Sequence, residues 1–151
     1  QFEASGLRVL VESETAGVHL ATSADGFRIV FFQGHPEYDT VSLLKEYKRE
    51  VVLYSQGKRA DYPPLLDHYF TPKACGILEE HREQVTAARA AGRALPEFPE
   101  SLVSATLDNT WHDTAEAVID NWVGKVYQLT HVDRKKPFQD SVDPDNPLGL
   151  R

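Results

Sequence analysis

The residues best suited to chemistry are His35 and Glu37, which are separated by a single proline. They follow an apolar run, residues 29–32, that we expect to form a strand. In open α/β sheets, active sites lie beyond the carboxyl ends of strands, so this position favours a functional role. A carboxylate within reach of the imidazole would fix its tautomer and stabilise its protonated form, as in nucleophile–base–acid triads. The alternative is a solvated loop that carries a histidine and a glutamate by chance.

The residues before this pair predict three strands. Residues 7–12 alternate apolar and polar side chains, and residues 18–21 form a second segment of the same kind. An Asp25-Gly26 pair then predicts a tight turn, because glycine supplies the positive φ that such turns need. The third segment, residues 27–32, ends in a continuous apolar run, which is typical of a strand buried on both faces and covered by helices.

A helix is expected directly after the His-Pro-Glu segment, beginning near Asp39 or Thr40 and ending at Gly57. Its apolar side chains form one stripe at steps of three and four residues: Leu44, Tyr47, Val51 and Tyr54. A strand, a short loop and a helix together form the βα unit of an open α/β sheet. The sequence therefore predicts the α/β class.

Two further helices are expected downstream. Residues 76–91 are rich in Glu, Arg and Ala and have a weak apolar face, which is typical of an exposed helix. The last helix should cover about residues 110–129, with a cap from Asn109 or Thr110. Its apolar face consists of Val118, Trp122, Val126 and Leu129, widened by Ala115 and Ile119. From Pro137 onwards we expect an extended, poorly packed tail.

Composition excludes several classes of function. The chain has 151 residues with 16 Lys+Arg and 23 Asp+Glu, a formal charge of −7, which argues against binding a nucleic-acid backbone. No apolar stretch approaches the roughly 20 residues that span a bilayer, and the start has no signal-peptide pattern. A single cysteine, Cys75, cannot form an internal disulfide, so we expect a reducing compartment, with the cytoplasm as the default.

No metal site is predicted. The histidines other than His35 have no zinc-like spacing, and we expect each to be structural or exposed: His19, His68, His81, His112 and His131.

Residues 31–39, Phe-Phe-Gln-Gly-His-Pro-Glu-Tyr-Asp, resemble the segment of the homoserine O-succinyltransferase (homoserine O-acyltransferase) family that carries its catalytic His and Glu. Residues 46–51 resemble the family's aromatic-Arg-acid-Val stretch on the following helix. Residues 121–130 resemble its C-terminal helix, and Trp111 matches the Trp that opens that region. The order of these segments along the chain is the same as in the family.

The resemblance covers about residues 7–54 and 108–132, and residues 55–107 are expected to be a longer, divergent insertion. On this basis residues 1–136 form the C-terminal part of a single acyltransferase domain, and residues 137–151 form an extended tail. The implied fold is the flavodoxin-like sheet of the class I glutamine-amidotransferase type. Three strands are few for such a sheet, and the chain contains no methionine. We therefore expect the fold to be incomplete in this chain.

The resemblance also implies a reaction. An acyl group would pass from an acyl-CoA, either succinyl-CoA or acetyl-CoA, to a cysteine and then to the hydroxyl of L-homoserine, in methionine biosynthesis. His35 would match the general base, Glu37 its orienting partner, and Arg49 the contact with the substrate carboxylate, a task suited to a bidentate guanidinium. Acyl-CoA is implied as co-substrate, with no other cofactor and no metal. A homodimer is implied, without nucleic acid or membrane as partner.

Two departures from the family pattern matter. The family's cysteine lies upstream of the His-Pro-Glu segment, but no cysteine precedes His35, and Cys75 lies downstream without a strand-to-helix elbow pattern. We therefore expect the nucleophile on an upstream half that acts as the partner of this chain. The family's Trp-Arg-Ser-His run reads Trp-His-Asp-Thr at residues 111–114, so no role that rests on that Arg and His is carried over.

Three alternatives stay open. A class I glutamine amidotransferase also uses a cysteine with His-x-Glu, although Arg49 and residues 121–130 favour the acyltransferase. A serine O-acyltransferase would need the same machinery. The chain could also be a non-catalytic regulatory module that kept the fold and lost the nucleophile.

Overall fold

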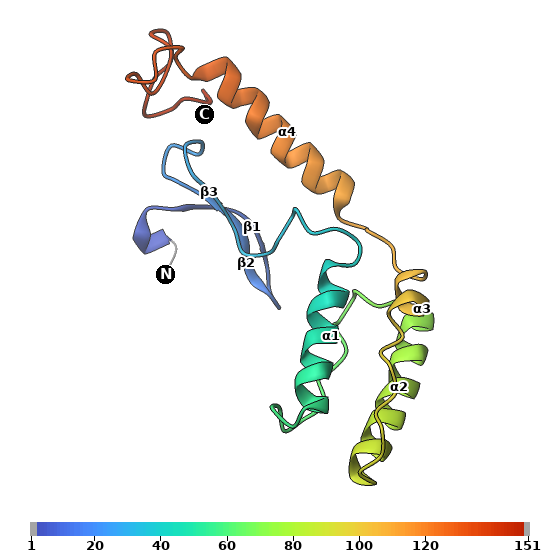
Figure 1. Cartoon of the computed structure of the whole chain (residues 1–151). Helices are drawn as coiled ribbons and strands as arrows, with labels where there is room; N and C mark the ends of the chain where they lie inside the picture. Colours follow the sequence, from blue (N-terminus) through green and yellow to red (C-terminus); the bar gives the residue numbers. More distant parts are fainter. Residues whose placement is uncertain (1–2, 150–151) are drawn as a thin grey trace. The chain divides into compact units, whose positions relative to one another are not determined.

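A computed structural model describes residues 3–149, so the last two residues of the predicted C-terminal tail lie outside the described part. The described chain is α/β (Figure 1). Its elements are η1 (Glu3–Ser5), β1 (Arg8–Ser13), β2 (Gly17–Thr22), β3 (Val30–Phe32), α1 (Ser42–Ser55), α2 (Pro72–Ala90), α3 (Glu100–Ser104) and α4 (His112–Leu129).

The chain divides into two compact units. The first unit combines Gln1–Glu37 with Trp111–Arg151 and so contains the strands and α4. The second unit is Tyr38–Thr110 and contains α1, α2 and α3.

The first unit is built on an antiparallel sheet in the order β1-β2-β3. The β1–β2 pair runs from Arg8 opposite Thr22 to Ser13 opposite Gly17, with register irregularities between them. The β2–β3 pair is short, from Leu20 opposite Phe32 to Thr22 opposite Val30. β2 is therefore the central strand, and among residues 3–149 β3 pairs with β2 alone.

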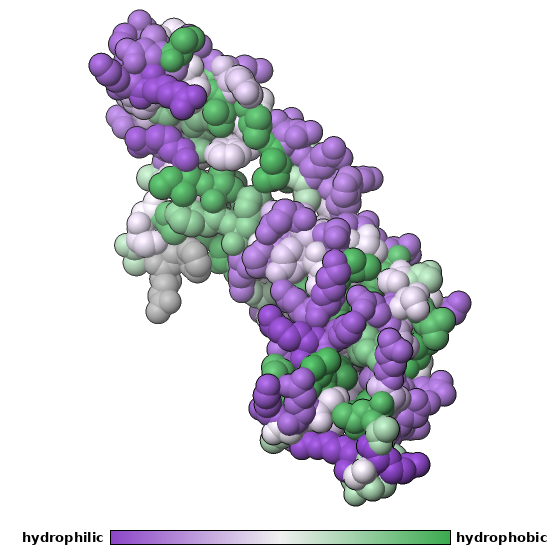
Figure 2. All heavy atoms as spheres, viewed as in Figure 1, coloured by the Kyte–Doolittle hydropathy of each residue, from purple (hydrophilic) through white to green (hydrophobic). Residues whose placement is uncertain are grey.

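The prediction of a third strand buried on both faces is wrong for this structure. Val30 and Phe32 are half-buried, whereas Ile29 and Phe31 are 52% and 42% exposed. The physical reason is that β3 forms one edge of the described sheet, so its second edge and part of its apolar surface are not covered. Figure 2 shows hydrophobic residues gathered on the surface of the first unit over its strands.

The third strand also begins later than predicted, because the loop before it is wide. The carboxylate of Asp25 accepts hydrogen bonds from the Ser23 hydroxyl at 2.7 Å and from the backbone N–H groups of Phe27 and Arg28 at 2.9 and 3.0 Å. The Arg28 guanidinium also donates to it. The predicted turn at Asp25-Gly26 is confirmed, since Gly26 has a φ of 75°.

These contacts set the charge of Asp25. Burial acts to raise the pKa of this carboxyl, but the hydrogen bonds from Ser23, Arg28 and Phe27 together hold it well below its ordinary value. The loop is thus organised around a buried carboxylate.

Helix α4 begins at His112, and its N-cap position is Trp111 rather than the predicted Asn109 or Thr110. Along α4, all of which is described, no side chain is fully buried. The predicted face is half-buried at Trp122, whose indole N–H donates to the Phe27 carbonyl at 3.0 Å. Beyond α4, residues 137–149 form turns without helix or strand, yet Phe138 is buried against the Phe27 ring.

In the second unit, the predicted stripe on α1 is confirmed at Leu44, Tyr47 and Val51, which are all buried. Gly57 follows the helix with a φ of 74°, as expected for a residue that ends a helix. The core of this unit joins α1, α2 and α3 with the segments between them: Leu44, Tyr47, Val51, Phe70, Ala74, Leu78, Val103 and Leu107.

The prediction of an exposed helix at residues 76–91 is wrong. α2 begins one turn earlier, where Thr71 caps it by accepting from the Ala74 N–H at 3.1 Å and Pro72 takes the first helical position. One face of α2 is buried, at Ala74, Leu78, His81, Val85 and Ala88. The stripe is hard to read in the sequence because two alanines and a histidine contribute to it.

No helix in residues 3–149 combines the length and the apolar character needed to cross a bilayer.

Candidate active site

His35 and Glu37 lie in the loop that follows β3, and the structure brings their side chains together. His35 Nδ1 lies 2.8 Å from Glu37 Oε1. The two side chains are 59% and 68% exposed. With Nδ1–H donating to the carboxylate, the neutral imidazole carries its lone pair on Nε2, where it can accept a proton.

The hydrogen bond from His35 is the main cause of a lowered pKa at Glu37, with a further contribution from a backbone N–H. Glu37 therefore keeps its charge to lower pH than an ordinary glutamate. A charged acceptor on Nδ1 holds one tautomer of the ring and stabilises a proton taken up at Nε2.

The start of this loop is held by β2. The Gln33 N–H donates to the His19 carbonyl at 2.9 Å, which continues the β2–β3 pairing past the end of β3. The His19 ring meets the Phe32 ring edge to face, with centroids 6.1 Å apart. Sequence reasoning treated His19 as an isolated histidine, because the register that places it opposite Gln33 cannot be read from spacing along the chain.

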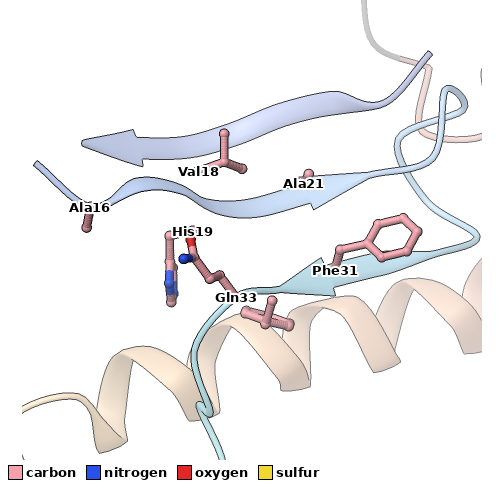
Figure 3. A pocket seen from close by; sticks show the side chains of 7 residues that line it. Ala16, Val18, His19, Ala21, Phe31 and Gln33 are labelled. Atoms are coloured by element: carbon pink, nitrogen blue, oxygen red, sulfur yellow. The ribbon is translucent and has the colours of Figure 1, made fainter. Parts of the chain in front are cut away.

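A cavity of about 430 Å³ lies beside this part of the sheet (Figure 3). Its walls are mostly apolar, with His19 and Gln33 as the polar side chains: Ala16, Val18, His19, Ala21, Phe31, Phe32 and Gln33. Figure 3 shows the His19 ring of β2 next to the side chain of Gln33, the residue that follows β3. The loop that carries His35 and Glu37 is therefore adjacent, through Gln33, to a concave apolar surface.

Arg49 lies on α1 in the second unit, and its side chain is 69% exposed. Its guanidinium makes a long contact, 3.4 Å, with the neighbouring Glu50. Glu50 is held more closely by Arg59, at 2.8 Å. Exposed pairs of this kind contribute little to stability, so Arg49 can exchange Glu50 for another carboxylate at small cost.

Tyr69 fixes the first turn of α1. Arg49 lies further along the same helix. The Tyr69 hydroxyl donates to the Thr40 carbonyl at 2.7 Å and accepts from the Leu44 N–H at 3.1 Å. Burial raises the pKa of this hydroxyl, so it remains neutral and available for both bonds.

Cys75 lies in the first turn of α2 and is half-buried. Its thiol contacts the Phe70 carbonyl, with Sγ 3.8 Å from the oxygen. The residues before α2 form no strand in the described chain, so the strand-to-helix elbow of a nucleophile is not formed here. Cys75 packs beside the core of the second unit.

One group of side chains in the described chain has the geometry to hold a metal ion. His112, Asp113 and Glu116, at the start of α4, place one ligand atom each within 4.8 Å of one another. Zinc-like histidine spacing does not identify this group, because two of its three residues are carboxylates. All three are exposed.

Comparisons with known proteins point to one family. The family model for homoserine O-succinyltransferase matches residues 1–132. Three similar proteins are each named homoserine O-succinyltransferase. The one from Nitrosococcus oceani is 61% identical over 151 residues, the one from Methylococcus capsulatus 62% over 148, and the one from Allochromatium vinosum 63% over 150.

These alignments cover 98% to 100% of this chain but only 42% of each relative. The chain therefore spans less than half the length of the relatives that it matches. No solved structure matches the chain.

Proposed function

We propose that this chain, which belongs to the homoserine O-succinyltransferase family, supplies the general base and its orienting carboxylate for an acyl transfer. The acyl donor is succinyl-CoA and the acceptor is the hydroxyl of L-homoserine, a step of methionine biosynthesis. The family's name and the relatives' names support succinyl rather than acetyl transfer.

The chain is, in this proposal, the C-terminal part of a polypeptide of the relatives' length, here called the full-length protein. The upstream part carries the nucleophilic cysteine. The complete fold is a flavodoxin-like sheet in which β3 is an internal strand rather than an edge. The exposure of Ile29 and Phe31 supports this, since both become buried when further strands and helices cover them.

In the first half-reaction, His35 Nε2 takes the proton of the cysteine thiol. The thiolate attacks the thioester carbonyl of succinyl-CoA, and the tetrahedral intermediate expels the CoA thiolate, which takes the proton from imidazolium. The charge of Glu37, 2.8 Å from Nδ1, stabilises the imidazolium while it exists. The product is a thioester between the succinyl group and the cysteine.

In the second half-reaction, His35 takes the proton of the homoserine hydroxyl as the oxygen attacks the acyl-cysteine. The cysteine leaves as thiolate and recovers a proton from imidazolium, which releases O-succinylhomoserine. Arg49 binds the carboxylate of homoserine through its planar fork. The weak hold of Glu50 on this guanidinium supports such an exchange of partners.

The observation that carries the proposal is the hydrogen bond between His35 and Glu37, formed directly after β3 in a chain that matches this family over residues 1–132. An imidazole that is held in one orientation can act as a general base. The amidotransferase and the regulatory module gain no comparable support, because the relatives are named as succinyltransferases.

The experiment compares the isolated 151 residues with the full-length protein. We expect succinyl transfer from succinyl-CoA to homoserine only in the full-length protein, because the base alone lacks a nucleophile. Formation of a protein thioester by the isolated chain, seen by mass spectrometry, would contradict the proposal.

A further inference from the structure

The backbone that leads to His35 is attached to a residue on the neighbouring strand. The ladder between β2 and β3 ends with Leu20 opposite Phe32. One residue later, the Gln33 N–H still donates to the His19 carbonyl, at 2.9 Å. His35 comes only two residues after this last bond, so its position depends on how Gly34 is held.

The side chain of His19 lies against Gly34. A Cβ atom added at Gly34 would come within 3.2 Å of His19 Cε1 and 3.7 Å of its Nδ1. The first distance is shorter than an ordinary contact between such atoms. The imidazole therefore occupies part of the space that a side chain at residue 34 would need.

The same ring is itself placed by the sheet. It packs edge to face on the Phe32 ring, with the ring planes 72° apart. It also stands beside the Gln33 side chain on the wall of the apolar cavity (Figure 3). A planar ring at this position thus bridges the last strand residue and the first loop residues.

We propose that His19 is a positioning residue for His35: its carbonyl and its ring hold Gln33 and Gly34, so that His35 leaves the sheet where its Nδ1 reaches Glu37. This inference rests on the proposed function, in which His35 is the base. A displacement of about 1 Å in a reacting group can cost on the order of a hundredfold in rate, so a support of this kind is consequential.

The variants are made in the full-length protein and separate the ring from its imidazole chemistry. His19→Ala removes the contact with Gly34, and we expect kcat to fall about tenfold or more, with a smaller change in KM. His19→Phe keeps a planar ring without nitrogens, and it should retain most of the wild-type kcat. As a control, His131→Ala removes a different histidine of the first unit and should leave kcat unchanged.

A double-mutant cycle tests the contact itself. Gly34→Ala places a methyl group against the His19 ring and should lower kcat severalfold. In the His19→Ala background the same methyl group meets no ring. The double variant should therefore be no slower than the slower of the two single variants. If the fold-losses in kcat of His19→Ala and Gly34→Ala multiplied in the double variant, the proposed coupling would be overturned.

A second measurement does not depend on turnover. The hydrogen bond from His35 lowers the pKa of Glu37. In His19→Ala a loosened loop should raise this pKa towards the ordinary value for glutamate, and in His19→Phe the pKa should stay low. Titration of ¹³C-labelled glutamate carboxyl groups by NMR, with Glu37→Gln for assignment, reads this directly.

Several results would overturn the inference. His19→Ala with wild-type kcat and an unchanged Glu37 titration would do so. His19→Phe as slow as His19→Ala would mean that the imidazole itself acts in the chemistry. If His19→Ala fails to fold, the kcat values of His19→Phe and Gly34→Ala are still compared with the wild-type value. A fully active His35→Ala variant would instead remove the proposed function, so the two failures are distinguishable.

Discussion

In the proposed mechanism, the imidazole of His35 and the carboxylate of Glu37 act only together. Each side chain is well exposed, and an exposed ion pair contributes little to folding. Their 2.8 Å contact therefore adds little to the stability of the fold. In the proposed mechanism the charge on Glu37 favours the protonated ring that forms in each half-reaction.

The first prediction follows from this dependence. In the full-length protein, His35→Ala should reduce kcat by about 10²–10⁴-fold or more, because the base also activates the nucleophile. Glu37→Gln keeps the shape but removes the charge, so it should cost less than His35→Ala. The double variant should be little worse than His35→Ala alone. Steady-state kinetics of the wild type, the two single variants and the double variant measures these effects. Losses in kcat that multiply strictly in the double variant would mean that Glu37 acts independently of His35.

The second prediction concerns Arg49. Replacing it with lysine exchanges a planar, bidentate donor for a point charge. We expect Arg49→Lys to raise the KM for homoserine and lower kcat, while the release of CoA in the absence of homoserine is little affected. Arg82→Lys, at another exposed arginine of the second unit, is the matched control. If Arg49→Lys slowed both half-reactions equally, Arg49 would not be the residue that binds the carboxylate of homoserine.

The sequence was sufficient to predict the His35–Glu37 contact, because two residues around one proline can meet through local geometry alone. The same reasoning does not identify His19 as a residue that supports the loop. Its contact with Gly34 depends on a strand register between residues far apart in the chain. Residues that support a site from another element need the fold before they can be identified.

At the scale of elements, the loop between β2 and β3 sets where β3 begins. Its centre is Asp25, which is buried and accepts hydrogen bonds from both backbone and side chains. The Trp122 indole is bound to the Phe27 carbonyl of the same loop. The loop thus connects the sheet with α4 inside the first unit.

The third prediction concerns the pH dependence of this loop. Asp25→Asn should destabilise the full-length protein by about 1.5–3 kcal/mol near neutral pH, because charge-assisted hydrogen bonds are lost. The folded-state pKa of Asp25 lies well below its ordinary value of 3.8. Its stabilising effect is therefore complete above that ordinary value and is lost as pH falls towards the folded-state pKa.

Urea unfolding of both proteins at several pH values measures this difference. Asp145→Asn, a change at an exposed aspartate of the same unit, serves as control. The gap between wild type and Asp25→Asn should shrink in acid. A gap that stays constant from neutral pH to strongly acidic pH would show that the charge of Asp25 is not what stabilises the loop.

Periodicity predicted α1 and failed for α2, for a physical reason. α1 buries large side chains at helical spacing, which are visible in the sequence. α2 buries Ala74, His81 and Ala88 as well as Leu78 and Val85, and small or polar residues give a weak pattern. Burial of such residues is decided by the partner surface rather than by the helix itself.

At the scale of the whole molecule, the chain corresponds to 42% of the length of its relatives. The class, the three strand segments and the α1 stripe were predictable, because they depend on local patterns. The burial of β3 was predicted from its composition and is not realised in this chain, where β3 is an edge.

In the proposed mechanism, this chain brings His35, as the base, to a cysteine that lies elsewhere in the full-length protein. The most direct measurement mixes the full-length protein with succinyl-CoA in the absence of homoserine and follows CoA release in a single turnover. We predict a burst of about one CoA per active site in the wild type, with a matching succinyl adduct on a cysteine upstream of residue 1. The burst should be slowed by about 10²-fold or more in His35→Ala. An equally fast burst in His35→Ala, or an adduct on Cys75, would contradict the account.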